Sequence, residues 1–294
     1  MGTLAEMLST PLGVIEWFVY LLAAVMFVIG LHLMNSPKTA RKGNMVSAIG
    51  MVFAVAMAFI VLFAGEISNG FKHSVAVVVL IVGIVIGAVA GVVSAKKVKM
   101  TDMPQLVSVF NTVGGGAAAL VALNDILTSA ETPSIVVLIT AGLGIMIGSV
   151  TFSGSLIAAG KLQGIKWVKK LSLPGKGFWN ILFVVLTIVS FVMLCVQPNQ
   201  RLLWSILTTV FALCYGLVFV IPIGGADMPV VISVLNACTG TAVAMSGLAI
   251  NNIALIVAGA LVGAAGVTLS IAMSKAMNRP LLSVLAGGFG GSNS

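Results

Sequence analysis

The sequence predicts an all-helical, polytopic membrane protein with about nine transmembrane helices and a parallel internal repeat. Of its 294 residues, 60% are hydrophobic and only 7% are charged, and the mean hydropathy is +1.19. A water-soluble domain of this length could not cover its surface with so few polar residues. The apolar runs are long and uninterrupted, whereas a transmembrane barrel would need shorter segments of alternating polarity.

Runs of about 17 to 25 apolar residues are long enough to cross a bilayer as helices. Nine such runs lie at roughly 14–34, 45–64, 75–95, 104–123, 134–159, 180–196, 202–221, 229–250 and 253–273. We therefore expect a transmembrane domain over residues 1–280, followed at 281–294 by a Gly-rich exit or linker. The tail at 285–294, LAGGFGGSNS, is expected to be flexible and to have no fold of its own.

The net charge of +8 is concentrated in alternate connections between the predicted helices. Basic residues follow the first, third, fifth and ninth helices, and Lys161 is one of those after the fifth. Only Lys72 and Arg201 fall in the opposite connections. By the positive-inside rule, the N-terminus is outside and the C-terminus is cytoplasmic. The basic residues thus report topology and do not indicate nucleic acid as a partner.

Two segments about 125 residues apart share the pattern D-M-P-x-x-x-S-V-[F/L]-N-x-x-x-G. They are TDMPQLVSVFNTVGG at 101–115 and ADMPVVISVLNACTG at 226–240. Each copy opens a predicted membrane helix, and the two helices are four apart in order, so they run in the same direction. A weaker likeness between 147–161 and 262–275 is consistent with a repeating unit made of two helices.

Asp102 and Asp227 each precede Met-Pro at the start of a repeat helix. A carboxylate there can accept backbone N–H bonds and complement the positive end of the helix, so capping is one interpretation of both residues. Lys97 and Lys99 lie near Asp102, whereas Asp227 follows a short connection without basic residues. Capping is the preferred interpretation for Asp102, while capping and a functional role are equally open for Asp227.

Each repeat helix carries a Ser and an Asn three residues apart, which places both on one helix face. The two pairs are Ser108 with Asn111 and Ser233 with Asn236. Bonding between helices explains one such pair, but two pairs at matched depth favour a shared polar path in which Asn and Ser orient water. Neither side chain gains or loses a proton near neutral pH. A titratable group would come from another chain, because no acidic or basic residue is expected in the middle of a span.

Glycines recur at helical spacing in several predicted spans, and helix packing is the preferred interpretation of them. Gly115 and Gly240 lie four residues beyond the repeat asparagines and leave space beside the two amides. Pairs of glycines four residues apart let helix backbones approach closely. These pairs are Gly87 with Gly91, Gly144 with Gly148, and Gly259 with Gly263.

Several kinds of site are not expected in this chain. Residues 114–119 match a dinucleotide-binding pattern on paper, but no strand precedes them and they lie within a membrane helix, where a phosphate-binding loop cannot form. The three cysteines fall in predicted spans without a spacing typical of zinc sites or disulfides. His32 and His73 are expected near helix ends. We therefore expect no catalytic, cofactor-binding or metal-binding residue in this chain.

Three segments carry a resemblance to a known family. MTDMPQLVSVFNTVGGGAAALVA, GGADMPVVISVLNACTGTAVA and AMNRPLLSVLAGGFGG look like the membrane domain of the beta subunit of proton-translocating NAD(P) transhydrogenase. The likeness covers nearly the whole chain. It implies a complex in which partner soluble domains pass hydride between NAD(H) and NADP(H) while the membrane domain translocates protons. It also implies alpha-type partner subunits, an NADP(H)-binding domain, a homodimeric complex and the inner membrane of a bacterium.

The resemblance implies roles for particular positions. Asn236 matches an Asn implicated in the proton path, and Asp227 matches an Asp near the cytoplasmic mouth, where the NADP(H) domain docks. Asp102 and Arg279 are expected at the same mouth. Some members have His where this chain has Asn111, while others place a membrane His in the alpha-type subunit, and we expect the second arrangement here.

The length of the chain is a second departure from the family and leaves its organisation open, and two other functions remain open as well. Family beta subunits continue past the GGFGG region into an NADP(H)-binding domain, so this chain is either a truncated membrane domain, which we prefer, or one part of a split subunit. A secondary transporter or ion pathway without redox chemistry would also use polar faces at equivalent depths. A membrane anchor for soluble enzymes would need no polar path at all.

Overall fold

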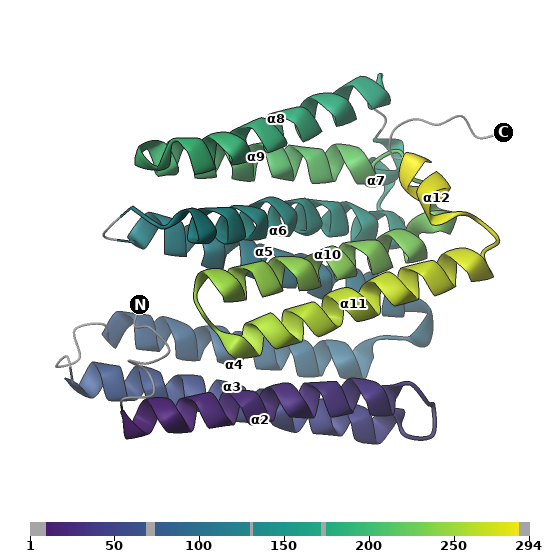
Figure 1. Cartoon of the computed structure of the whole chain (residues 1–294). Coiled ribbons are helices and arrows are strands. Elements are labelled where there is room, and N and C mark those ends of the chain that lie inside the picture. The colour runs from purple at the N-terminus through teal and green to yellow at the C-terminus, as the bar shows by residue number, and fades with distance from the viewer. Residues whose placement is uncertain (1–9, 69–73, 130–131, 172–174, 288–294) are drawn as a thin grey trace. The chain divides into compact units, whose positions relative to one another are not determined.

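The computed structural model of the chain describes residues 10–68, 74–129, 132–171 and 175–287, and all regular structure within these ranges is helical (Figure 1). Lys72 and His73, discussed above, lie outside these residues. The chain divides into two compact units, residues 1–98 and residues 99–294. The repeat and its polar residues all belong to the second unit.

Nine helices of the described residues are long and apolar enough to cross a membrane, which confirms the predicted all-helical fold class. They are α2 (Pro11–Met34), α3 (Ala40–Ser68), α4 (Ser74–Lys97), α5 (Met103–Thr128), α6 (Ile135–Leu162), α8 (Lys176–Val196), α9 (Arg201–Val220), α10 (Met228–Ala249) and α11 (Ile253–Ala276). Several helices extend beyond the predicted runs. As one result, Lys161 belongs to the last turn of α6 and not to the connection after it.

Local sequence explains where several of these helices begin. Thr10, Ser134 and Asn252 precede α2, α6 and α11, and their side chains accept hydrogen bonds from the backbone N–H groups of Gly13, Val137 and Leu255. Such bonds satisfy donors that have no partner within the helix. Pro11 also suits the first turn of α2, because its missing N–H would have no helical acceptor there.

In the first unit, α2 and α3 pack closely along their length. A Cβ atom added at Gly30 would lie 2.9 Å from the carbonyl oxygen of Gly43, so the two backbones approach at this pair of glycines. Within the first unit, Gly87 and Gly91 of α4 do not have the packing role expected of them. A Cβ at either position would meet no described atom within 4 Å.

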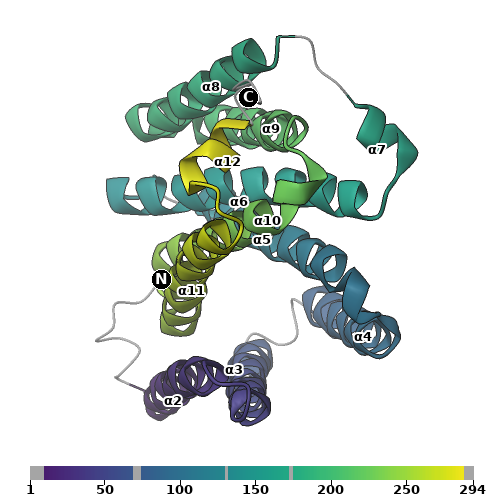
Figure 2. The ribbon, with the colours of Figure 1, turned by 90° about the vertical axis from the view of Figure 1, so that its right-hand side faces the viewer.

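In the second unit, α10 packs against α5, α6 and α11, and α6 also packs against α9. The end view shows α10 among these helices, with α8 on the far side of α9 (Figure 2). Of the nine membrane-length helices, α10 is the most buried. The second copy of the repeat therefore begins the helix at the centre of this unit.

Two apolar clusters occupy opposite ends of the second unit. One contains Ile126 of α5, Leu138 of α6 and Leu194 of α8. The other contains Val220 and Met228 on either side of the α9–α10 connection, and it lies at the end where α5 and α10 begin, which we call the Asp227 end. Serine, threonine, asparagine and glycine are concentrated between the clusters on α5, α6 and α10.

The remaining short elements were not predicted. They are α7 (Lys166–Lys170), α12 (Leu281–Gly287) and three 3-10 turns, η1 (Met100–Asp102), η2 (Pro198–Gln200) and η3 (Gly225–Asp227). The expectation of an unstructured tail from Leu285 is wrong for its first residues, because α12 continues to Gly287. Val284 of α12 is buried in the cluster at the Asp227 end, and this contact holds the short helix in place. The rest of the tail lies outside the described residues.

Candidate functional site

Three buried polar residues form a hydrogen-bonded cluster between α5 and α6. Ser108 donates from Oγ to the carbonyl oxygen of Ser155 at 2.7 Å, and Asn111 donates from Nδ2 to Ser155 Oγ at 2.7 Å. Ser108 and Ser155 are fully buried, and Asn111 is 5% exposed. The predicted Ser–Asn face of the first repeat therefore points at α6. Ser155 completes the cluster, although the sequence pattern did not single it out.

The same region contains buried polar atoms that no described residue satisfies. They are Oδ1 of Asn111 on α5 and Oγ1 of Thr239 on α10. Oγ of Ser149 on α6 is also buried without a described partner, but Ser149 lies one turn from Ser153, whose side chain faces Gly216 of α9. Thr239 approaches α5, because its Cγ2 would lie 3.2 Å from a Cβ at Gly114. A buried polar atom without a partner costs about 1–3 kcal/mol, so proteins rarely keep several in one region without a further donor or acceptor. The arrangement favours hydration or a contributed polar group between these helices.

The second repeat uses its serine in the same way and its asparagine differently. Ser233 of α10 donates to the carbonyl oxygen of Gly266 on α11 at 3.2 Å, just as Ser108 bonds to the helix that follows α5. Asn236 is partly buried, and its side chain makes no hydrogen bond to any described residue. The two asparagines thus occupy equivalent places in the sequence but different surroundings.

Glycines bring the helices of each repeat together. A Cβ at Gly115 would lie 3.0 Å from the carbonyl oxygen of Gly148 on α6. A Cβ at Gly240 would lie 2.8 Å from the carbonyl oxygen of Gly259 and 2.9 Å from Cα of Gly263, both on α11. Gly240 therefore meets both members of the pair Gly259 and Gly263, whereas Gly115 meets Gly148 and not Gly144. In both copies a side chain at the repeat glycine would approach backbone atoms of the next helix.

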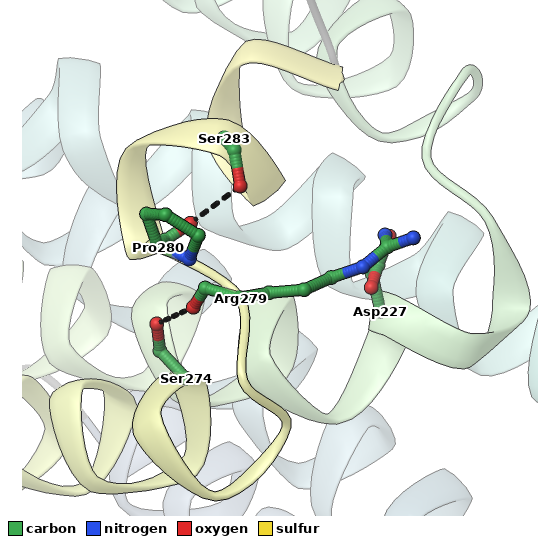
Figure 3. A network of polar contacts seen from close by, with 5 residues as sticks. All are labelled: Asp227, Ser274, Arg279, Pro280 and Ser283. Atoms are coloured by element: carbon green, nitrogen blue, oxygen red, sulfur yellow. Dashed lines mark hydrogen bonds and ion pairs between the residues drawn. The ribbon is translucent and has the colours of Figure 1, made fainter. Parts of the chain in front are cut away.

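An ion pair lies at the Asp227 end. Arg279 donates from Nη1 to Oδ2 of Asp227 at 2.7 Å, and the arginine side chain extends from the α11–α12 connection toward the start of α10 (Figure 3). The Asp227 side chain is 14% exposed and that of Arg279 is 55% exposed. Asn278 has a φ of 52°, a left-handed conformation that Asn adopts more readily than most residues, and this turn precedes Arg279. Oδ1 of Asp227 is buried and has no partner among the described residues.

The two aspartates of the repeat differ in their contacts. Each ends a 3-10 turn directly before its helix, yet neither carboxylate accepts a capping hydrogen bond. The interpretation of Asp102 as a side-chain cap is therefore wrong. Asp102 is exposed, and its described contact is a 3.5 Å hydrogen bond from Thr101 Oγ1. Of the three residues predicted at this mouth, the structure joins Asp227 and Arg279 and leaves Asp102 outside the pair.

Comparison with known proteins places the chain in a family. A family model described as NAD(P) transhydrogenase beta subunit matches residues 16–294. The chain belongs to the NAD(P) transhydrogenase beta subunit family. Two curated relatives from Rhodospirillum rubrum, both named NAD(P) transhydrogenase subunit beta, are each 38% identical to it over 279 residues. The match covers 92% of this chain and 57% of each relative, so the chain spans little more than half their length.

In this transhydrogenase-family chain, the repeat pattern did not identify the residues that bond to the repeat side chains or face them. Ser155 lies in the segment of α6 that weakly resembles α11, and that segment is rich in Ser and Thr. Regularly spaced hydroxyl groups on a buried helix were the available signal. Thr239 directly precedes the repeat glycine Gly240, and nothing in its position alone marked it as a buried group facing α5.

Proposed function

We propose that this chain forms the proton path of a proton-translocating NAD(P) transhydrogenase and couples that path to nucleotide-dependent changes in soluble domains. The observation that carries the proposal is the buried Ser108–Asn111–Ser155 cluster with the unsatisfied oxygen of Asn111. A polar track through a bundle is costly in an apolar surrounding, and such tracks mark ion pathways in membrane proteins. The family supplies the reaction to which such a path would be coupled.

The path would run between α5, α6 and α10. Asn111 and Thr239 each present a buried atom that a water molecule could bond, and Ser108 and Ser155 lie beside Asn111. Ser233 and Asn236 of α10 would extend the path toward α11, to which Ser233 bonds. Hydroxyl and amide groups accept and donate hydrogen bonds and so can order a water chain. None of them binds a proton near neutral pH, so these residues guide the proton but do not hold it.

The titratable group is proposed to come from an alpha-type partner subunit, as a membrane histidine. This proposal accounts for an asparagine at position 111, whose unsatisfied Oδ1 could accept a hydrogen bond from an imidazole N–H. Replacing every membrane histidine of the partner is expected to abolish coupled proton transport while leaving the complex assembled. Coupled transport that persists in such a variant would contradict the proposal.

The assignment of the rest of the complex follows the same proposal. Residues 1–280 form the membrane domain, with the N-terminus outside and the C-terminus in the cytoplasm of a bacterium. Residues 281–294 lead toward an NADP(H)-binding domain, while NAD(H) binds to another partner domain. The complex is proposed to be a homodimer of these assemblies. In this proposal, Asp227 and Arg279 lie at the cytoplasmic mouth of the path. A change of nucleotide state in the soluble domain could alter access to the path only if that domain favours one of two conformations of the membrane domain.

Asn236→Ala provides the clearest test of a polar path in this chain. The Asn236 side chain bonds to no described residue, so its removal should change the unfolding temperature little. We expect NADP(H)-dependent proton uptake into proteoliposomes to fall by roughly tenfold, within the range that single residues on a coupling path produce. The exposed Thr241 of the same helix provides the control, Thr241→Ala, which should retain uptake.

The same assay separates the other functions. Uptake that does not depend on NADP(H) would favour a transporter without redox chemistry. Full uptake in Asn236→Ala would remove this residue from the path, and the absence of NADP(H)-dependent uptake in the unaltered complex would favour a membrane anchor.

A further inference from the structure

Lys161 makes an unusual set of contacts at the Asp227 end. From the last turn of α6, its Nζ donates to the carbonyl oxygens of Val220 at 3.2 Å, of Ile221, and of Ile223 at 2.8 Å. These three residues end α9 and begin the connection to α10. The positive-inside pattern alone would place this lysine among the charges exposed to the cytoplasm, yet its ammonium group turns toward a neighbouring helix end.

The chemistry of a helix end explains why an ammonium fits there. The last carbonyl groups of an α-helix lack partners within the helix, and the negative end of the helix dipole favours a cation. An ammonium has three N–H donors, so Lys161 can give one to each of the three carbonyl groups. Buried Val220, Ile221 and Ile223 surround these carbonyls with apolar side chains, which limits competition from water.

The connection held by Lys161 leads directly to the ion pair. The N–H group of Ile223 donates to the carbonyl oxygen of Val220 at 3.2 Å, and that of Asp227 donates to the carbonyl oxygen of Gly224 at 3.1 Å. The backbone from the end of α9 to Asp227 therefore contains two tight turns, which meet at the extended residue Gly224. On the other side of the ion pair, Val284 of α12 packs in the same apolar cluster as Ile223. A shift of the connection would move Asp227 relative to Arg279.

We propose that Lys161 is a positioning residue that fixes the α9–α10 connection and thereby orients Asp227 toward Arg279. The effect of Lys161 passes through its hydrogen bonds to the backbone of residues 220–223, which leads on to Asp227. The effect of Lys161 on the position of the α9–α10 connection does not depend on the proposed function. Its consequence for coupling rests on the proposed function.

Distance measurements between spin labels test the structural part. Gly224 is exposed, and a Cβ there meets no described atom within 4 Å, while Leu282 of α12 is 79% exposed. Labels at Gly224→Cys and Leu282→Cys, in a chain whose native cysteines are replaced by Ala, report the connection relative to α12. The chain is assembled with its partners in lipid nanodiscs. A single narrow distance distribution is expected for the parent and for Lys161→Arg, whose guanidinium keeps the charge and several donors.

Lys161→Met keeps the length of the side chain and removes its donors. We expect a distribution at least about twice as wide, since the connection can then sample several positions, whereas Lys166→Met should leave it narrow. Lys166 is an exposed lysine at the start of α7 and serves as the matched control. An unchanged distribution in Lys161→Met would overturn the proposal.

The coupling consequence is measured as protons moved per hydride transferred in the same set of variants. Lys161→Met is expected to lower this ratio roughly fivefold, Lys161→Arg to restore most of it, and Lys166→Met to leave it unchanged. A lysine that merely stabilised the fold would lower the amount of assembled complex and leave the ratio of the surviving complex intact, and that result would overturn the positioning role. A parent complex that moves no protons per hydride transferred would instead count against the proposed function. The distances between the labels would still test the role of Lys161.

Discussion

Asp227→Asn is expected to lower proton-coupled transhydrogenation about tenfold, whereas Asp102→Asn should change it less than about twofold. The reason is the difference in contacts. Asp227 is largely covered and bonds to Arg279 at 2.7 Å, while Asp102 is exposed and lies outside the pair. Asn keeps the size of the side chain but removes the charge that holds the guanidinium at the start of α10. Both variants are measured as proton uptake per unit of assembled complex.

The ion pair between Asp227 and Arg279 is expected to contribute little to stability, so unfolding would not explain a loss of coupling in Asp227→Asn. More than half of the Arg279 side chain is exposed, and an ion pair of this kind stabilises a fold by no more than about 1 kcal/mol. The unfolding temperature of Asp227→Asn should therefore stay close to that of the parent. Arg279→Gln should reproduce the loss of coupling, and combining the two substitutions should add little, because each removes the same interaction. Equal and mild effects of Asp102→Asn and Asp227→Asn would contradict the assignment of the mouth to this pair.

Gly240→Ala is expected to destabilise the chain strongly. The added Cβ would lie within 3 Å of backbone atoms of Gly259 and Gly263, and backbone cannot move aside as the end of a side chain can. Overpacking of this kind costs about 1–3 kcal/mol, which corresponds to an apparent unfolding temperature lower by several degrees in a chain of this size. Thermal unfolding of the purified chain in detergent measures the effect.

Gly87→Ala provides the matched control, with an expected effect of the opposite sign. A Cβ at Gly87 of α4 meets no described atom within 4 Å, and Ala favours a helix over Gly by roughly 0.5–1 kcal/mol. The unfolding temperature should be unchanged or slightly higher. If Gly240→Ala behaved like Gly87→Ala, the close approach of α10 and α11 would be wrong.

The membrane helices could be predicted from the sequence because their signal is local. A bilayer requires a continuous run of apolar residues, and each of the nine runs satisfies that requirement by its own composition. The short helix α12 could not be found in this way, since its position depends on the burial of Val284 against residues of other helices. Glycine spacing shows the same limit: the pattern is alike at Gly87 and Gly259, yet only Gly259 meets another backbone.

The polar residues of the site were predicted more completely than their contacts. Repetition identified Ser108, Asn111 and their counterparts on α10, because duplicated polar groups in an apolar helix are conspicuous. Repetition placed the two asparagines at matched depth but could not give their surroundings, which differ because Asn111 bonds to Ser155 and Asn236 bonds to no described residue. The partner of Asp227 is 52 residues away in the chain, and no local pattern connects the two.

Lys161 illustrates why charge counting alone does not reveal a role. The positive-inside rule treats each lysine in a connection as equivalent, since it depends on charge and position in sequence only. The contacts of Lys161 arise because α6 extends to Leu162 and packs beside the end of α9. Its acceptors are backbone carbonyl groups, which every residue possesses. No residue type in the sequence therefore identifies them.

The measurement that tests the proton-path assignment most directly uses the complex purified through this chain from its native host and sealed into liposomes with a pH-sensitive dye. NADPH and an analogue of NAD are added, and reduction of the analogue is recorded together with the internal pH. We predict that reduction and proton movement occur together, that an uncoupler alters both, and that Asn236→Ala removes proton movement. Reduction without any proton movement, in liposomes shown to be sealed and with all subunits present, would contradict the assignment of a proton path to this chain.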